Sequence, residues 1–275
     1  MANEYQSELD RINNEVNIQK DLLDQVVLAL SDKAAGGHMH GLIDRTIQSI
    51  SNDHAASIGK YTFAYCEAMT AAELSIASEV GDYAFYYCGA LQAVSLPKAK
   101  TIGKNVFERC SALKNVNLPA AETFGQNAFQ RCIALENVNL PAATDLSYYM
   151  FEGCSMLQKA VAPSCKTVSN YAFYNCNSLE TVDLGKVYDI AGPVSKIGSG
   201  AFNNCSKLTA LILRTNWIFE WASATSPFTN TPIANGAGYI YVPADWVDGY
   251  KVAAHWSDYA DQIRAIEDYP DITGG

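Results

Sequence analysis

Charge is scarce in this sequence, and long apolar runs are missing. Only 17% of the 275 residues are charged, below the roughly 25% of an average soluble protein. The net charge is −10 and there is no basic run, which argues against nucleic-acid binding, because neutralised phosphates supply most of that affinity. Binding to anionic lipid is disfavoured for the same reason. No stretch approaches the roughly 18 consecutive apolar residues of a membrane-spanning helix, so we expect no membrane insertion.

Motifs of catalysis and cofactor binding are also missing. The sequence contains no G-x-S-x-G, G-x-x-x-x-G-K-[ST], H-E-x-x-H or G-x-G-x-x-G motif, and these motifs mark nucleophiles, phosphate loops and zinc sites. Its carboxylates are scattered at differing offsets and form no obvious acid–base pair. We therefore expect no catalytic residues, no metal and no cofactor.

A repeat organises most of the chain. Phenylalanines recur at a step of 22 residues, and the last one follows an insertion around Tyr188–Lys196. Each is followed three positions later by a cysteine and six positions later by leucine or methionine. The phenylalanines are Phe63, Phe85, Phe107, Phe129, Phe151, Phe173 and Phe202, and the cysteines are Cys66, Cys88, Cys110, Cys132, Cys154, Cys176 and Cys205. A period of this length indicates a leucine-rich-repeat solenoid.

Each repeat predicts one turn of the solenoid. Apolar and polar residues alternate through Val116, Asn117 and Leu118, which predicts a short strand. Proline follows this strand in several repeats and ends it. The segment with Phe and Cys is expected to return as a short helical turn, with both side chains pointing inward. One turn cannot bury its own apolar side, so the turns must stack and the end turns need caps.

The pattern apolar-Gly-x-x-Ala-Phe-x-x-Cys-x-x-Leu-x-x-Val-x-Leu-Pro, over about residues 50–213, resembles the BspA-like leucine-rich repeats. This resemblance implies an α/β-type solenoid from a gut bacterium or prophage that serves adhesion or recognition rather than catalysis. It also implies a host or bacterial surface protein, or a glycan, as the partner. Surface-attached members usually carry export signals. The N-terminal residues here show no basic segment followed by an apolar one, so we expect no signal peptide and synthesis in the bacterial cytoplasm.

The residue pattern divides the chain into four parts. We expect an amphipathic helix at 1–35, a hinge and N-terminal cap at 36–49, the repeats at 50–213, and a degenerate repeat with a C-terminal helical cap at 214–275. Near the C-terminus, Pro243 is expected to start one helix. Ser257 is expected to cap a second helical run that contains Tyr259, Ile263 and Ile266.

Apolar residues at alternating steps of three and four mark the N-terminal segment. They are Leu9, Ile12, Val16, Leu23, Val26 and Leu30, and Gln19 interrupts them. This spacing is typical of a coiled coil, and leucine at the a positions favours trimers or tetramers over dimers. We therefore expect a homo-oligomer, with a trimer favoured, through residues 1–33. The alternative is an amphipathic helix that packs on the end of its own solenoid.

The cysteines and histidines do not form a metal-binding pattern. Seven of the eight cysteines follow the repeat, without the close pairs that metal sites use. We interpret them as small apolar core side chains with free thiols, and Cys165 as a replacement for the alanine of other repeats. His38 and His40 lie in a glycine-rich hinge, as solvated linker residues or as an ion site on a trimer axis.

Outward strand positions supply the candidate binding residues. They lie eight and ten residues after each Phe, and the two series end at Ala210 and Ile212. The candidate binding residues among them are Glu73, Ser95, Asn115, Asn117, Asn137, Asn139, Thr181 and Asp183, and Lys159 lies in the same series. They predict a flat polar sheet that hydrogen-bonds a protein or glycan, or a face that serves solubility alone. Tyrosines beside the Phe positions suit recognition or packing of the turn edge, and neither role is favoured by the sequence.

Three functions compete. The first is a non-catalytic recognition or adhesion module, in which a helical stalk presents several solenoids on a phage particle or bacterial surface. The second is a structural spacer or assembly protein of a virion or surface complex, with no specific ligand on the repeat face. The third, an enzyme assembled from carboxylates of distant repeats, is the least supported.

Overall fold

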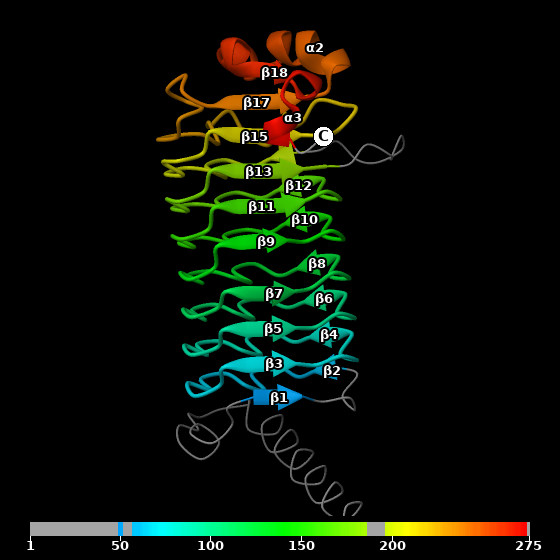
Figure 1. Cartoon of the computed structure of the whole chain (residues 1–275), viewed down its shortest axis with the longest axis vertical. Helices are drawn as coiled ribbons and strands as arrows, with labels where there is room; N and C mark the ends of the chain where they lie inside the picture. Colours follow the sequence, from blue (N-terminus) through cyan, green and yellow to red (C-terminus); the bar gives the residue numbers. More distant parts are fainter. Residues whose placement is uncertain (1–48, 52–56, 186–195, 274–275) are drawn as a thin grey trace, which may run out of the picture.

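The computed structural model describes residues 49–51, 57–185 and 196–273. They wind into a parallel-strand solenoid of about nine turns (Figure 1). The long strands are β1 (Ser49–Ser51), β3 (Ala71–Glu73), β5 (Ala93–Ser95), β7 (Asn115–Asn117), β9 (Asn137–Asn139), β11 (Lys159–Ala162), β13 (Thr181–Leu184), β15 (Ala210–Leu213) and β17 (Tyr239–Val242). The short strands are β2 (Ser57–Ile58), β4 (Glu79–Val80), β6 (Thr101–Ile102), β8 (Thr123–Phe124), β10 (Asp145–Leu146), β12 (Thr167–Val168), β14 (Lys196–Ile197) and β16 (Glu220–Trp221).

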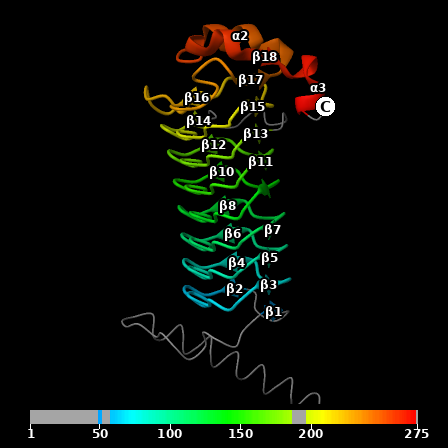
Figure 2. The ribbon, with the colours of Figure 1, turned by 60° about the vertical axis from the view of Figure 1, so that its left-hand side comes forward.

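Strands pair in parallel with the equivalent strand one turn away. In the first long-strand sheet, for example, Ala71 pairs with Ala93, and Ala93 with Asn115. The long strands form the sheets β1-β3-β5-β7 and β9-β11-β13-β15-β17-β18, and the short strands form β2-β4-β6-β8 and β10-β12-β14-β16. Figures 1 and 2 show the long and the short strands as two separate columns of one stack. The hydrogen bonds between turns therefore run along the long axis of the molecule.

The repeated Phe and Cys form the centre of the core, as the sequence predicted. The buried Phe rings stack from Phe63 to Phe228, with neighbouring centroids 5.1–5.7 Å apart. The sulfhydryls of the repeat cysteines from Cys88 to Cys205 each donate to the carbonyl oxygen of the Phe one turn back, at 3.0–3.1 Å, whereas Cys165, outside this ladder, donates to Thr167 O. The cysteines therefore fill space and also link neighbouring turns.

The return segment is not the short helical turn that we expected. We call the stretch from two residues before to three residues after each Phe the turn edge. Nearly every turn edge has a residue with positive φ two positions before its Phe and another two positions after it, and these left-handed residues interrupt helical geometry. Alternate N–H groups donate to the next turn instead, as from Phe63 N to Ala84 O and from Tyr65 N to Tyr86 O, both at 2.7 Å.

A glycine follows five of the eight short strands, β2, β4, β6, β8 and β14, and permits close contact between turns. A Cβ on Gly125 would lie 2.5 Å from Lys104 N and 2.6 Å from Gly103 C. Because both atoms belong to the backbone, neither can move aside cheaply. Glycine is thus a packing requirement at Gly125, while Ser147 and Ser169 hold the equivalent position in the next two turns.

Helical elements in the described chain are confined to its C-terminal end, which lies at the top of Figure 1. They are η1 (Ala244–Trp246), α2 (Val247–Val252), η2 (Ser257–Gln262), η3 (Ile266–Asp268) and α3 (Pro270–Thr273), with β18 (Ile263–Ala265) between them. A helix does follow Pro243, and a second helical run begins at Ser257 and contains Tyr259, but it ends at Gln262 instead of continuing through Ile263. Ser257 makes no capping hydrogen bond, and Ile263 lies in β18 because it pairs with Ile240 of β17.

Aromatic side chains hold this end against the last turns. Tyr250 and Trp256 are buried, and the Trp256 indole N–H donates to Phe219 O at 2.5 Å. The Tyr250 hydroxyl accepts from Phe219 N at 3.0 Å and donates to Trp217 O at 3.2 Å. Burial raises the pKa of Tyr250 to about 12, so its hydroxyl stays protonated and able to donate.

Candidate functional site

The face of the long strands β3 to β11 carries an open groove of about 710 Å³. Six of the eight predicted binding residues line it, namely Glu73, Ser95, Asn115, Asn117, Asn137 and Asn139. The other two, Thr181 and Asp183, lie further along the same face on β13. The period of two within each strand explains this arrangement, because it points Val138 inward while Asn137 and Asn139 face solvent.

Four asparagines form the middle of the groove. Strands β7 and β9 are neighbours in the stack, and each carries an exposed Asn at its first and last position. β7 ends one long-strand sheet and β9 begins the other, so no strand pairing joins them. The four carboxamides nevertheless line the same groove from two successive turns, and we call this set the asparagine lattice. Each carboxamide both donates and accepts hydrogen bonds, and Asn117 Nδ2 already donates to Ser95 Oγ one turn back at 2.9 Å. The lattice can therefore bind a polar, uncharged surface.

Sequence reasoning counted Lys159 among the outward strand positions but missed the other charged residues that border this groove. Exposed Lys114, Glu136 and Lys159 also line it. Lys114 and Glu136 lie seven residues after their Phe, and this position directly precedes the long strand. The signal was available in the repeat, but we considered only the positions that alternate within the strand.

The long-strand face is closed near the C-terminal end. Ala210 and Ile212, the last outward positions of the two series, were expected to face solvent. They are instead buried against Tyr241 and Ile266, because β17 extends the sheet and the chain after β18 folds across it. Next to them, Arg214 binds Asp183 through two hydrogen bonds, Nε to Oδ1 at 2.8 Å and Nη2 to Oδ2 at 3.0 Å. Asp183 is therefore already engaged by a cation.

Tyrosines occupy strained positions on the turn edge. Tyr61, Tyr65, Tyr83, Tyr87, Tyr149 and Tyr171 all have φ between 53° and 63°. This conformation costs a residue with a side chain about 1–2 kcal/mol. Equivalent positions in other turns hold asparagine or glycine, which adopt it more readily, or arginine, at Arg109 and Arg131. The rings stack from turn to turn, with centroids 4.8 Å apart for Tyr61 and Tyr83 and 5.2 Å apart for Tyr149 and Tyr171.

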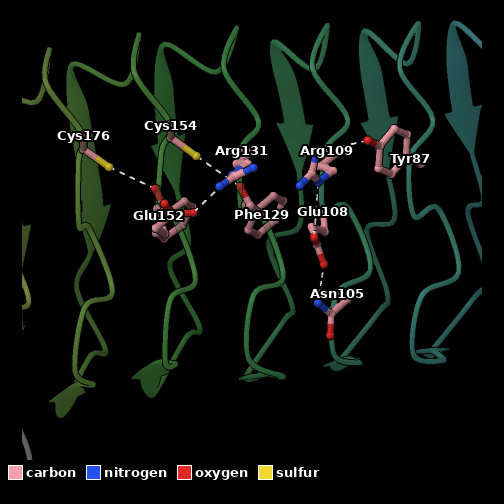
Figure 3. Close-up of polar contacts among 10 residues, drawn as sticks. Tyr87, Asn105, Glu108, Arg109, Phe129, Arg131, Glu152, Cys154 and Cys176 are labelled. Atoms are coloured by element: carbon pink, nitrogen blue, oxygen red, sulfur yellow. Dashed lines mark hydrogen bonds and ion pairs between the residues drawn. The ribbon is translucent and has the colours of Figure 1, made fainter.

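Two half-buried glutamates lie behind the middle turns of this edge (Figure 3). Glu108 accepts a hydrogen bond from Asn105 Nδ2 and lies 3.6 Å from Arg109 Nε. Arg109 Nη1 also donates to the Tyr87 hydroxyl at 3.0 Å, and its guanidinium lies over the Tyr87 ring. In the following turns, Arg131 Nε lies 3.7 Å from Glu152 Oε2. These carboxylates are held by neighbouring side chains rather than aimed at a common point.

The described residues assemble no metal or nucleophile site. No group of three His, Cys, Asp or Glu is placed to hold a metal ion within them. Burial raises the pKa of the Cys110, Cys132, Cys154, Cys165 and Cys176 thiols, and a thiol must ionise to act as a nucleophile. No helix of this part of the chain is long and apolar enough to cross a membrane.

Several predicted features lie outside the described residues. They are the proposed oligomerisation residues Leu9, Ile12, Val16, Leu23, Val26 and Leu30, together with His38 and His40 in the hinge. The insertion before Lys196 lies largely outside as well. These features therefore stay predictions from the sequence.

Stacked parallel-strand turns, a buried Phe and Cys ladder and an open polar strand face define a leucine-rich-repeat module. The model of the BspA type leucine rich repeat region matches this sequence over residues 45–158, 78–209 and 122–235, in six copies. The chain belongs to this family, as its repeat predicted. A search of curated proteins finds no relative.

Solved structures share the fold at low sequence identity. A leucine-rich-repeat protein from T. pallidum is 21% identical, with a TM-score of 0.52, over 59% of this chain and 78% of that one. A leucine rich cell surface protein from Faecalibacterium prausnitzii is 21% identical, with a TM-score of 0.46, over 70% of this chain and 68% of that one. A leucine-rich repeat protein from Bacteroides ovatus is 20% identical, with a TM-score of 0.42, over 75% of this chain and 65% of that one.

Proposed function

We propose that this chain is a non-catalytic recognition module and that the groove over β3 to β11 binds a surface protein or glycan. The observation that carries this proposal is the lattice of Asn115, Asn117, Asn137 and Asn139. Four exposed carboxamides on two successive turns of the solenoid can hydrogen-bond a polar ligand, and their ordered backbone limits the entropy lost on binding. Family membership supports a repeat module of a kind that is not typically enzymatic.

The setting of this module is also part of the proposal. One similar structure is described as a cell surface protein, and we place the present chain on a phage particle or bacterial surface. Residues 1–35 would form the helical stalk and join several copies. The buried contacts of Tyr250 and Trp256 support a capping role for the C-terminal segment, since the last turn of a solenoid needs cover.

A paired binding screen tests the groove. Full-length protein is applied to an array of glycans and to a panel of purified bacterial and host surface proteins, beside the double variant Asn115→Ala/Asn139→Ala. We expect a ligand whose binding weakens at least about tenfold in the variant. Thr123→Ala, an exposed change on the short strand β8, is the matched control and should keep full binding. Ligands that bind all three proteins equally would contradict the groove assignment and favour the spacer role.

Light scattering tests the stalk. The full chain should show the mass of an oligomer, with a trimer favoured, and protein lacking residues 1–37 should show the mass of a monomer. A monomeric full chain would favour the alternative, in which the helix packs on its own solenoid.

A further inference from the structure

We propose that the solenoid contains a hinge between the turn of β7 and the turn of β9, and that this hinge opens and closes on the long-strand face. Among the described strands, the neighbouring long strands from β1 to β17 pair with each other everywhere except between β7 and β9. The short strands β8 and β10, in the same two turns, do not pair with each other either. Figure 1 shows β7 and β9 farther apart than the long strands above and below them. We call this interruption of the long strands the strand gap.

A main-chain donor that is paired in the neighbouring turns has no partner at the strand gap. The N–H of Leu96 donates to Asn117 O at 3.0 Å, and that of Leu140 donates to Val161 O at 2.9 Å. The equivalent N–H of Leu118 donates to no described residue. Leu118 is fully buried, and a buried N–H without a partner costs free energy. The interface between these two turns therefore lacks stabilisation that its neighbours have, which favours local motion there.

Pairing is lost at the other end of the two strands as well. Before β7, Lys114 N donates to Gln92 O at 2.9 Å, and before β11, Gln158 N donates to Glu136 O at 2.7 Å. Between these turns, the N–H of Glu136 donates to no residue of the described chain, and Lys114 O accepts from none. The strand gap therefore runs along the whole length of β7 and β9.

A larger side chain in the core explains the strand gap. In the short strands from β2 to β14, the second residue is isoleucine, valine or leucine in six turns and phenylalanine in one, Phe124 of β8. Phe124 is buried, and its ring centroid lies 6.0 Å from that of Phe129 in the core ladder. A close-packed interior has no spare volume for a second ring within one turn, so the neighbouring turns are pushed apart.

Contacts that remain on the other sides of the solenoid fix the axis of the hinge. On the turn edge, Phe107 N donates to Ala128 O at 2.8 Å. At the corner after the short strands, Ser147 Oγ donates to Gly125 O at 2.7 Å. Motion about these retained contacts moves the long strands most, and so widens or narrows the strand gap.

The groove crosses this hinge. Asn115 and Asn117 lie on one side of the strand gap, and Asn137 and Asn139 lie on the other. A change in the width of the gap therefore changes the spacing between the two pairs of carboxamides. This coupling rests on the proposed function of the groove: a ligand that contacts both pairs should hold the hinge at one width.

Distances between spin labels on the full chain test the hinge. Gln92 and Gln158 are exposed, lie seven residues after their Phe, and are separated by three turns that include the strand gap. Glu136 and Thr209 are exposed at the same repeat position and are also three turns apart, on one side of the gap. All eight native cysteines are buried, so labels attach to two introduced cysteines. Gln92→Cys/Gln158→Cys should give a distance distribution about twice as wide as that of Glu136→Cys/Thr209→Cys.

Phe124→Ile tests the cause of the gap. Ile102 holds the same position one turn earlier, in a turn whose long strand is paired on both sides. The variant should restore pairing, narrow the distribution across the gap to the width of the control pair, and slow hydrogen exchange of the Leu118 amide at least about tenfold. Leu146→Ile makes a similar change at the same position one turn later and should alter neither measurement. Phe124→Leu is the second variant, because leucine holds this position at Leu146.

The outcomes separate the hinge from the groove. Equal widths for the two label pairs, or a Leu118 amide that exchanges in the native chain as slowly as that of Leu96, would overturn the hinge. An unchanged distribution in both Phe124→Ile and Phe124→Leu would overturn Phe124 as its cause. These measurements use the free chain, so they decide the hinge even when no groove ligand is found. A groove ligand that leaves the distribution across the gap unchanged would overturn the coupling and leave the groove in place.

Discussion

Cysteine meets two requirements at its position in the repeat. The space beneath the turn edge is small and apolar, and the Phe carbonyl one turn back has a lone pair to spare after accepting the N–H of its own turn, as in Cys110 N to Phe107 O. An S–H group fills this space and donates a weak hydrogen bond to this carbonyl. Alanine would meet only the first requirement. The ladder is therefore explained by packing, without metal or disulfide chemistry.

The buried thiols predict a loss of stability in alkali. Burial raises the pKa of Cys165 to about 12 and that of Cys132 well above 9.0. A thiol whose pKa is raised by folding stabilises the native state fully below about pH 9, and this contribution is lost as the pH rises toward the folded pKa. Each such thiol costs up to about 1.4 kcal/mol per pH unit in that window. The urea midpoint should therefore fall steeply between about pH 9 and pH 11.

Cys165→Ala is the control for this pH dependence. Alanine holds the equivalent buried position at Ala77, Ala99, Ala121 and Ala143, so the variant should fold and lose less stability in alkali than the native chain. Native thiols should react slowly at neutral pH, and denatured protein should titrate all eight cysteines. Rapid labelling of several native thiols would contradict their burial.

Leu135 and Asn139 test the assignment of the strand faces. Leu135 is fully buried in the middle of the stack and Asn139 is exposed. Leu135→Ala should cost about 2–5 kcal/mol by leaving a cavity, and Asn139→Ala less than about 0.5 kcal/mol. Thermal and urea melts measure both. Equal destabilisation would mean that the faces are reversed, and the groove proposal would fall with them.

At the scale of elements, the long strands could be predicted from the sequence, but the short strands and the backbone conformation of the turn edge could not. The step of 22 residues and the alternation in the long strands located the turns, the core Phe and Cys and the outward asparagines. The short strands were missed because two residues are too few to show a period. The turn edge was taken for a helical turn because apolar spacing cannot report positive φ at residues such as Tyr61 and Arg109.

The end of the chain shows a different limit. Ile263 and Ile266 have helical spacing, yet β17 offers an open edge and Ile263 pairs with it. Such tertiary pairing overrides local propensity and does not appear in the sequence. The closure of the face over Ile212 has the same cause.

Gly125 and Gly89 differ in how closely neighbouring atoms approach them, and this difference can be tested by substitution. Gly125→Ala should destabilise strongly, by several kcal/mol, because its Cβ would meet backbone atoms 2.5–2.6 Å away. Gly89→Ala should change stability by less than about 0.5 kcal/mol, since the nearest atom, Ser111 Oγ, lies 3.9 Å away. Circular dichroism melts of the two variants make the comparison. A tolerated Gly125→Ala would show that the turns can move apart.

At the scale of the whole molecule, each turn contacts mainly its two neighbours. Stability in such a stack is a sum of turns and the interfaces between them. A cavity at Leu135 should therefore weaken one interface and let the two halves of the stack unfold separately.

The direction of the hydrogen bonds between turns has a mechanical consequence. Tension applied between the two ends of the rod loads these bonds along their own axis and breaks them one row at a time. The rod should therefore unravel in small steps at modest force, each releasing one repeat of 22 residues, or about 75 Å of extended chain. Optical tweezers attached to the two termini would record a staircase of such steps, and a single large rip would show that the turns resist as one body. A protein that joins two surfaces in this way would lengthen under load and refold when the load is removed, and so would limit the force passed between the surfaces.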